Sequence, residues 1–121
     1  MYPFAYRKPA SLAAAVQALR DDDGAKLLAG GQSLLAAMRQ RLAMHSALVD
    51  IGALAELQGI RREGDRLVIG AGEKHADVAA SAEVAAAIPA LAALAGGIGD
   101  PLVRHMGTLG GSIANNDPSA D

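Results

Sequence analysis

The stretch Thr-Leu-Gly-Gly-Ser at residues 108–112 decides how the rest of the chain is interpreted, and a shorter counterpart, Ala-Gly-Gly-Gln-Ser, lies at residues 29–33. Each stretch holds a glycine pair beside a small hydroxyl residue. A glycine pair after a strand permits positive φ angles and removes the Cβ atoms that would keep a ligand away from the backbone. Consecutive backbone N–H groups and a following helix N-terminus then form an anion site. Two such loops are expected to hold a pyrophosphate from both sides.

A glycine pair is also a common turn, and this alternative stays open for either stretch taken alone. Neither the dinucleotide fingerprint G-x-G-x-x-G nor the phosphate-loop pattern G-x-x-x-x-G-K-[ST] occurs in the sequence. Spacing alone therefore predicts an anionic, phosphorylated ligand and does not identify it.

The composition argues against several classes of function. The 121 residues are 51% hydrophobic and 2% aromatic, with a formal net charge of -2 and no cysteine. Interspersed charges of both signs argue against nucleic acid or an anionic membrane as the main partner. Without cysteine the chain has no disulfide and no thiolate ligand for a metal or an iron–sulfur cluster. No signal peptide and no membrane insertion are expected, and the expected location is the cytoplasm.

The first half of the chain alternates strand and helix patterns. A short edge strand is predicted at residues 4–9, and a helix over Leu12–Arg20 with Ser11 as its N-cap. A short buried strand at residues 25–29 leads into the first glycine stretch. A helix at residues 33–41 and an apolar strand at residues 47–51 follow. This pattern predicts a small α/β lobe over residues 1–53.

The second half begins with a predicted hairpin, residues 57–62 and 66–70, around a Glu-Gly-Asp turn. Alanine-rich helices follow at residues 76–81 and 82–95, and Pro89 is expected to kink or divide the second of them. The glycine pair at residues 96–97 is interpreted as a helix C-cap, and residues 98–121 as a segment rich in turns. His75 is interpreted as an exposed residue at a loop or helix start. No catalytic residue and no metal ligand are expected in this chain.

Three segments, residues 28–34, 48–51 and 103–118, resemble the FAD-binding medium subunit of molybdenum hydroxylases. The resemblance is strongest to the carbon monoxide dehydrogenase medium-chain type, which is similar to the flavin domain of xanthine dehydrogenase. It implies an α+β, two-lobed FAD-binding domain of the molybdopterin dehydrogenase (PCMH-type) kind. The N-terminal α/β lobe would be residues 1–53, and residues 54–121 would begin the second FAD-binding lobe of a longer subunit.

The resemblance also implies which residues contact the cofactor. In that family the two glycine loops cradle the FAD pyrophosphate, a carboxylate touches the flavin portion, and an apolar residue lies against the cofactor. Ser112 stands where the family commonly has Asn, and Gln32 where some relatives have His. Carried over by position, the cofactor-binding residues are Ala29, Gly30, Gly31, Gln32, Ser33, Ile98, Thr108, Leu109, Gly110, Gly111, Ser112 and Asp121.

The implied function is that of an oxidoreductase subunit whose substrate is oxidised on another chain. FAD would pass electrons from [2Fe-2S] clusters on a partner to NAD, oxygen or a quinone-type acceptor. The implied partners are an iron–sulfur subunit and a large molybdopterin subunit, assembled as a dimer of heterotrimers. Two alternatives stay open: a truncated interaction subunit without flavin, and a molybdenum-independent FAD oxidase. The substrate, whether carbon monoxide, an aldehyde, a purine or another N-heterocycle, is not predicted.

Overall fold

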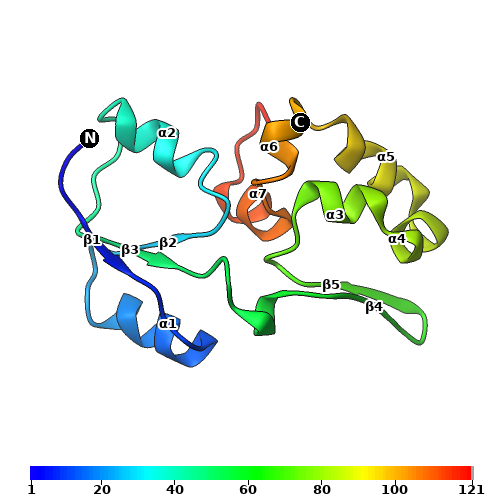
Figure 1. Ribbon diagram of the computed structural model, residues 1–121, viewed down its shortest axis with the longest axis horizontal. Coiled ribbons are helices and arrows are strands. Elements are labelled where there is room, and N and C mark those ends of the chain that lie inside the picture. The colour runs from blue at the N-terminus through cyan, green and yellow to red at the C-terminus, as the bar shows by residue number, and fades with distance from the viewer. Residues whose placement is uncertain (121) are drawn as a thin grey trace. The chain divides into compact units, whose positions relative to one another are not determined.

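The structure, a computed structural model, describes residues 1–120. The chain forms two compact units, unit 1 at Met1–Glu56 and unit 2 at Leu57–Asp121. A short 3-10 helix, η1 (Ala55–Leu57), lies where the chain passes from one unit into the next. Both units mix helices and strands, as the α+β fold class predicts (Figure 1).

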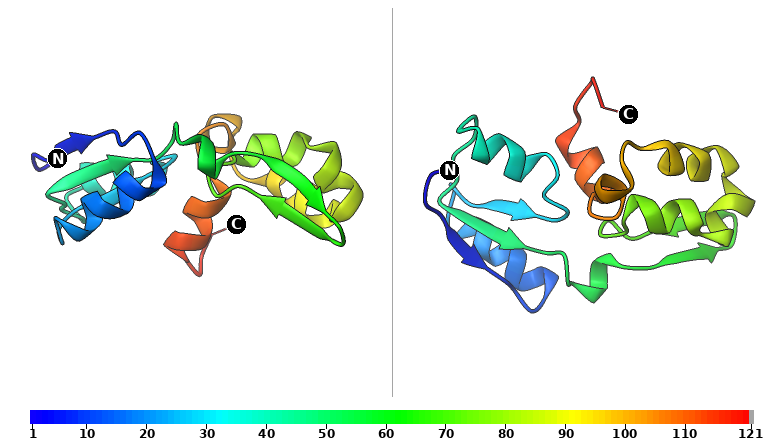
Figure 2. Two further views of the ribbon diagram at one scale, coloured as in Figure 1. Left: turned by 90° about the horizontal axis from the view of Figure 1, so that it is seen from below. Right: turned by 45° about the horizontal axis from the view of Figure 1, so that its top comes forward.

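Unit 1 is built on three short parallel strands: β1 (Ala5–Arg7), β2 (Lys26–Leu28) and β3 (Ala47–Asp50). Their order in the sheet is β1-β3-β2, so β3 is the central strand. The first three residues of β3 are no more than 1% exposed, because strands flank them on both sides and a helix lies on each face of the sheet (Figures 1 and 2). The carboxyl ends of the three parallel strands lie at the same end of the sheet, and the first glycine stretch follows β2 at that end.

Two helices connect the strands of unit 1 and lie on opposite faces of its sheet, α1 (Leu12–Arg20) and α2 (Leu34–Arg39) (Figures 1 and 2). The predicted N-cap of α1 is confirmed, since the Ser11 hydroxyl accepts the backbone N–H of Ala14 at 3.1 Å. The prediction that the second strand is buried is wrong. β2 is an edge strand, and its Leu27 is 39% exposed.

Unit 2 begins with the predicted hairpin, formed by β4 (Ile60–Glu63) and β5 (Arg66–Ile69). Gly64 in its turn has a φ of 62°, the left-handed conformation that glycine adopts readily. Helices α3 (His75–Ala80), α4 (Ala82–Ala87) and α5 (Pro89–Gly97) follow, and Pro89 separates α4 from α5 as predicted. The core between helices and hairpin consists of Val78, Val84 and Ala95, with Ile60, Leu67, Ile69 and Leu91 packed against them.

The segment predicted to be rich in turns instead contains two helices, α6 (Pro101–Arg104) and α7 (Leu109–Asn115). Each begins at a side-chain N-cap, because Asp100 accepts the N–H of Leu102 at 2.7 Å and Thr108 caps α7. The pair at residues 96–97 lies in the last turn of α5, not after it. Within residues 1–120, no helix is both long enough and apolar enough to cross a membrane.

Candidate functional site

The first glycine motif, residues 29–33, connects β2 to α2 in unit 1 (Figure 1). Gly31 has a φ of 75°, and Gln32 and Ser33 are exposed. The backbone N–H groups of these three residues donate no hydrogen bond to any residue in the part of the chain that the structure describes. The Ser33 hydroxyl does not cap α2 either. Three consecutive N–H groups are therefore available to an anion, which is the arrangement that the sequence predicts for this motif.

The backbone conformation of Gly31, more than the space around it, explains why glycine occupies this position. A Cβ atom there would lie 2.9 Å from Cδ1 of Leu35 and 3.2 Å from Cδ1 of Leu28. The positive φ disfavours any other residue, whatever space its side chain has. The motif thus presents backbone and no side chain at its centre, so the residues present fit a phosphate group that approaches closely.

The strand next to the first motif is fixed by a side-chain contact that the sequence did not predict. Asp50, the last residue of β3, accepts a short hydrogen bond from the Tyr6 hydroxyl and a second one, at 2.8 Å, from the N–H of Gly52. The bond to Asp50 raises the pKa of Tyr6 above its ordinary value. Tyr6 and Asp50 are 44 residues apart, and only the pairing of β1 with β3 brings them together.

The second glycine motif, residues 108–112, forms the first turn of α7 in unit 2. The N–H groups of Leu109 and Gly110 donate, at 2.9 Å each, to carbonyl oxygens of the segment between β5 and α3. The next two N–H groups donate to the hydroxyl and the carbonyl of Thr108, both at 3.0 Å. The expectation that this motif also presents free N–H groups is therefore wrong, because capping and packing of α7 use all four.

The glycine pair of the second motif has a packing role. A Cβ atom on Gly110 would lie 2.6 Å from the carbonyl oxygen of Ala71, and one on Gly111 would lie 2.7 Å from Oγ1 of Thr108. Gly110 lets α7 begin close to the segment before α3, and Gly111 leaves room for the hydroxyl of Thr108 that caps α7. The groups of this motif that can still donate to a ligand are hydroxyl protons, on the 6% exposed Thr108 and on the exposed Ser112.

His75 is buried, 5% exposed, so its interpretation as an exposed residue is wrong. It is the first residue of α3, and its N–H donates to the carbonyl of Gly107 at 3.1 Å. Its ring nitrogen Nε2 lies 3.1 Å from Oγ of Ser112, in α7. Burial lowers the pKa of His75 and favours the neutral ring. No local sequence pattern predicts this contact, because His75 and Ser112 are 37 positions apart in the chain.

The remaining predicted site residues lie elsewhere. Ile98 is half-buried after α5, and its carbonyl accepts from Nη1 of Arg104 at 3.3 Å. Asp121 lies outside the described residues. Among residues 1–120, no group of three or more His, Cys, Asp or Glu side chains could hold a metal ion.

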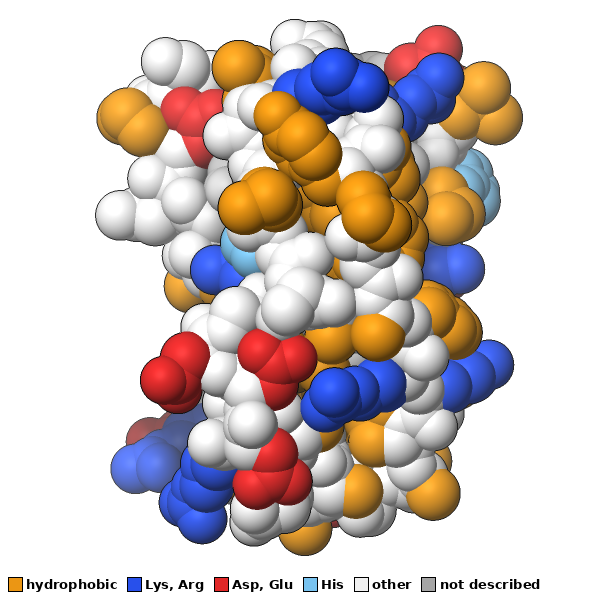
Figure 3. All heavy atoms as spheres, turned by 90° about the vertical axis from the view of Figure 1, so that its left-hand side faces the viewer, with side chains coloured by type: hydrophobic (Ala, Val, Ile, Leu, Met, Phe, Trp, Pro, Cys, Tyr) orange, Lys and Arg blue, Asp and Glu red, His pale blue; other side chains and the backbone are white. Residues whose placement is uncertain are grey.

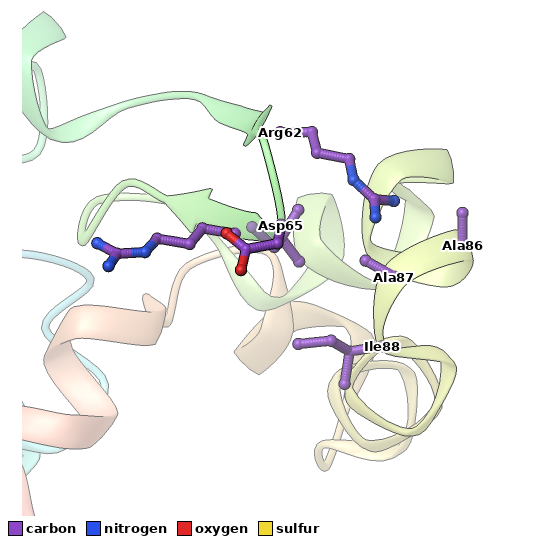
Figure 4. Close-up of a pocket in the computed structure, with 7 residues that line it drawn as sticks. Arg62, Asp65, Ala86, Ala87 and Ile88 are labelled. Atoms are coloured by element: carbon purple, nitrogen blue, oxygen red, sulfur yellow. The ribbon is translucent and has the colours of Figure 1, made fainter.

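A pocket in unit 2 involves none of the predicted site residues. It lies between the β4–β5 hairpin and the end of α4 (Figure 4), and its lining residues are Arg62, Asp65, Arg66, Leu67, Ala86, Ala87 and Ile88. Two arginines and one aspartate give it mixed charge. We assign it no role in holding the ligand of the glycine motifs.

Comparison with known proteins gives a consistent set of matches. Residues 2–121 match the family model described as the FAD binding domain in molybdopterin dehydrogenase. The chain is 46% identical over 119 residues to the carbon monoxide dehydrogenase medium chain of Hydrogenophaga pseudoflava, covering 98% of this chain and 42% of that protein. It is 39% identical over 116 residues to the nicotine 6-hydroxylase medium subunit of Paenarthrobacter nicotinovorans, covering 96% and 41%.

Solved structures agree with these matches. A carbon monoxide dehydrogenase structure from Hydrogenophaga pseudoflava superposes with a TM-score of 0.96 at 47% identity, over 100% of this chain and 43% of that one. Quinoline 2-oxidoreductase from Pseudomonas putida 86 superposes with a TM-score of 0.96 at 39% identity, over 99% and 42%. The chain spans about two fifths of the length of the relatives it matches.

Proposed function

Because this chain belongs to the family of FAD-binding domains in molybdopterin dehydrogenases, we propose that it holds FAD in the electron-transfer subunit of a molybdenum-containing hydroxylase. When bound, FAD supplies redox chemistry between iron–sulfur clusters on a partner chain and an external acceptor. The observation that carries the proposal is that the N–H groups of Gly31, Gln32 and Ser33 donate to no group within residues 1–120, in a chain that matches the family from residue 2 to residue 121.

The proposed roles of the residues follow from the groups that each motif leaves available. The first motif donates backbone N–H groups and the Ser33 hydroxyl to the pyrophosphate, while the second donates the hydroxyls of Thr108 and Ser112. Ile98 supplies an apolar contact, and Asp121 a carboxylate toward the flavin. The proposal keeps the full set predicted from the sequence: residues 29–33, Ile98, residues 108–112 and Asp121.

The proposed partners are an iron–sulfur subunit and a large molybdopterin subunit, in a dimer of heterotrimers in the cytoplasm. The names "medium chain" and "medium subunit" of the relatives support a multi-subunit assembly. Unit 1 also exposes large apolar side chains, with Leu42 77% and Met44 70% exposed. Figure 3 shows hydrophobic side chains beside Lys and Arg side chains on the surface at the left of Figure 1. Such surfaces are typical of regions that other protein segments cover.

The test of the function separates electron entry from electron exit. The purified complex is reduced anaerobically with dithionite and mixed rapidly with NAD or a quinone, while cluster absorbance is followed. We expect rapid re-oxidation of the clusters when FAD is bound. A Gly31→Asp variant that keeps its metals but lacks FAD is expected to re-oxidise at least about tenfold more slowly. Equal rates with and without FAD would mean that electrons do not leave through the flavin.

The alternatives give different results in the same preparation. A complex that holds FAD but neither molybdenum nor iron would be a molybdenum-independent FAD oxidase. A complex that holds the metals but no flavin would make this chain an interaction subunit.

Ser33→Ala is expected to weaken FAD binding roughly tenfold, because a hydrogen bond to a charged acceptor contributes about 1.5–3 kcal/mol. Thr108→Ala removes a second hydroxyl and also the bond to the N–H of Gly111. It should therefore weaken FAD binding and lower the free energy of unfolding by about 1 kcal/mol. FAD titration and urea unfolding measure the two effects. Unchanged affinity in Ser33→Ala would rule out its hydroxyl as a contact.

A further inference from the structure

We propose that His75 is a positioning residue for the second glycine motif. In this proposal its Nε2–H donates to Oγ of Ser112, which leaves the Ser112 hydroxyl proton to donate to a phosphate oxygen of the cofactor. The proposal rests on the proposed function, since it assumes that the second motif faces FAD.

The ring of His75 is held in place from several directions. Its backbone N–H donates to the carbonyl of Gly107 at 3.1 Å, which fixes the start of α3 against the segment before α7. The ring edge packs so closely on Gly107 that a Cβ atom there would lie 3.1 Å from Cδ2 of His75. With the residue 5% exposed, Nε2 has a fixed position 3.1 Å from Oγ of Ser112. A ring fixed in this way restricts the rotamer of the serine side chain.

The direction of this hydrogen bond decides what the serine can do. A hydroxyl has one proton to donate and lone pairs with which to accept. If Nε2 accepts, it uses the only proton of Ser112. If Nε2–H donates, that proton is free for an anion, and the neutral ring that burial favours still carries the one N–H needed. The backbone N–H of Ser112 is already bonded to Thr108, so the hydroxyl is the donor that this residue can offer.

Two charged side chains on the neighbouring segments, those of Arg104 and Glu73, have partners of their own. Nη1 of Arg104, in α6, donates to the carbonyls of Ile98 and Gly99 at 3.3 and 3.1 Å. The Glu73 carboxylate, two residues before His75, accepts the N–H of Gly59. Ser112 is therefore the side-chain partner of the His75 ring within the described residues.

The test compares two substitutions of His75 in the protein purified as it occurs, with FAD affinity as the readout. His75→Leu removes the donor and keeps a side chain of similar bulk, while His75→Gln keeps an N–H donor of similar reach. We expect the Kd for FAD to rise about tenfold in His75→Leu and to stay within about threefold of the unchanged protein in His75→Gln. A purely structural role for the ring would weaken both variants alike, and that result would overturn the proposal.

A double-mutant cycle supplies the second readout. Ser112→Ala alters an exposed residue, so it remains informative if His75→Leu fails to fold. We expect Ser112→Ala to weaken FAD binding at least as much as His75→Leu does, and the double variant to bind FAD no more weakly than Ser112→Ala alone. Additive losses, or an unchanged Kd in Ser112→Ala, would overturn the proposal while FAD binding itself stands. If the unsubstituted protein binds no FAD, both this proposal and the proposed function are overturned.

Discussion

Gly31→Asp is expected to abolish FAD retention while unit 1 stays folded. The new Cβ would lie 2.9 Å from a terminal methyl group of Leu35, which is flexible enough to move aside. The carboxylate would stand beside the free N–H groups of Gln32 and Ser33 and take the place of a phosphate oxygen. Repulsion between like charges then opposes the ligand. We expect the Kd for FAD to rise by at least about a hundredfold, which corresponds to about 2.7 kcal/mol.

A matched control exists in the hairpin of unit 2. Gly64 has a φ of 62°, close to the 75° of Gly31, and a Cβ atom there would meet nothing within 4 Å. Gly64→Asp therefore adds the same charge at a similar backbone cost, away from the glycine motifs. Flavin absorbance of the two purified variants is the measurement. If Gly31→Asp retained its flavin as fully as the control Gly64→Asp does, the assignment of residues 29–33 to the phosphate would be refuted.

Gly110→Ala is expected to destabilise unit 2 strongly. Its Cβ would lie 2.6 Å from both Cβ and the carbonyl oxygen of Ala71, and backbone cannot swing aside as a side-chain end can. The hydrogen bond from the N–H of Gly110 to the same carbonyl, 2.9 Å long, would be lost as α7 moves away. Overpacking of this kind costs about 1–3 kcal/mol, and the lost bond adds about 1 kcal/mol.

Gly97→Ala is the control for this substitution. Gly97 is also helical, in the last turn of α5, and a Cβ atom there would meet nothing within 4 Å. Because alanine restricts the unfolded chain more than glycine does, Gly97→Ala should be neutral or stabilising by up to about 1 kcal/mol. Urea unfolding of both variants gives the comparison. Equal stability of the two would show that α7 does not depend on its close approach to Ala71.

Local signals explain most of the elements that could be predicted from the sequence. Ser11 marks the start of α1, the Gly-Asp turn marks the hairpin, and Pro89 marks the division between two helices. In each case the deciding residue lies within or next to the element. The family resemblance, from motifs spread along the chain, is confirmed by the match over residues 2–121.

The errors share a different physical cause, which is contact between distant segments. His75 is buried because Gly107 and Ser112 pack on it. The N–H groups of Leu109 and Gly110 donate to carbonyls of the β5–α3 segment, which no pattern within residues 108–112 could reveal. Helices α6 and α7 were also missed, because glycine-rich composition outweighed the capping residues Asp100 and Thr108.

The FAD content of the protein, purified as it occurs, tests the central claim most directly. Flavin is released, identified and counted per chain, and the stripped protein is then titrated with FAD. The account predicts one FAD per chain and full recovery of binding on titration. A protein that keeps its molybdenum and iron, contains no flavin and takes up no added FAD would contradict it.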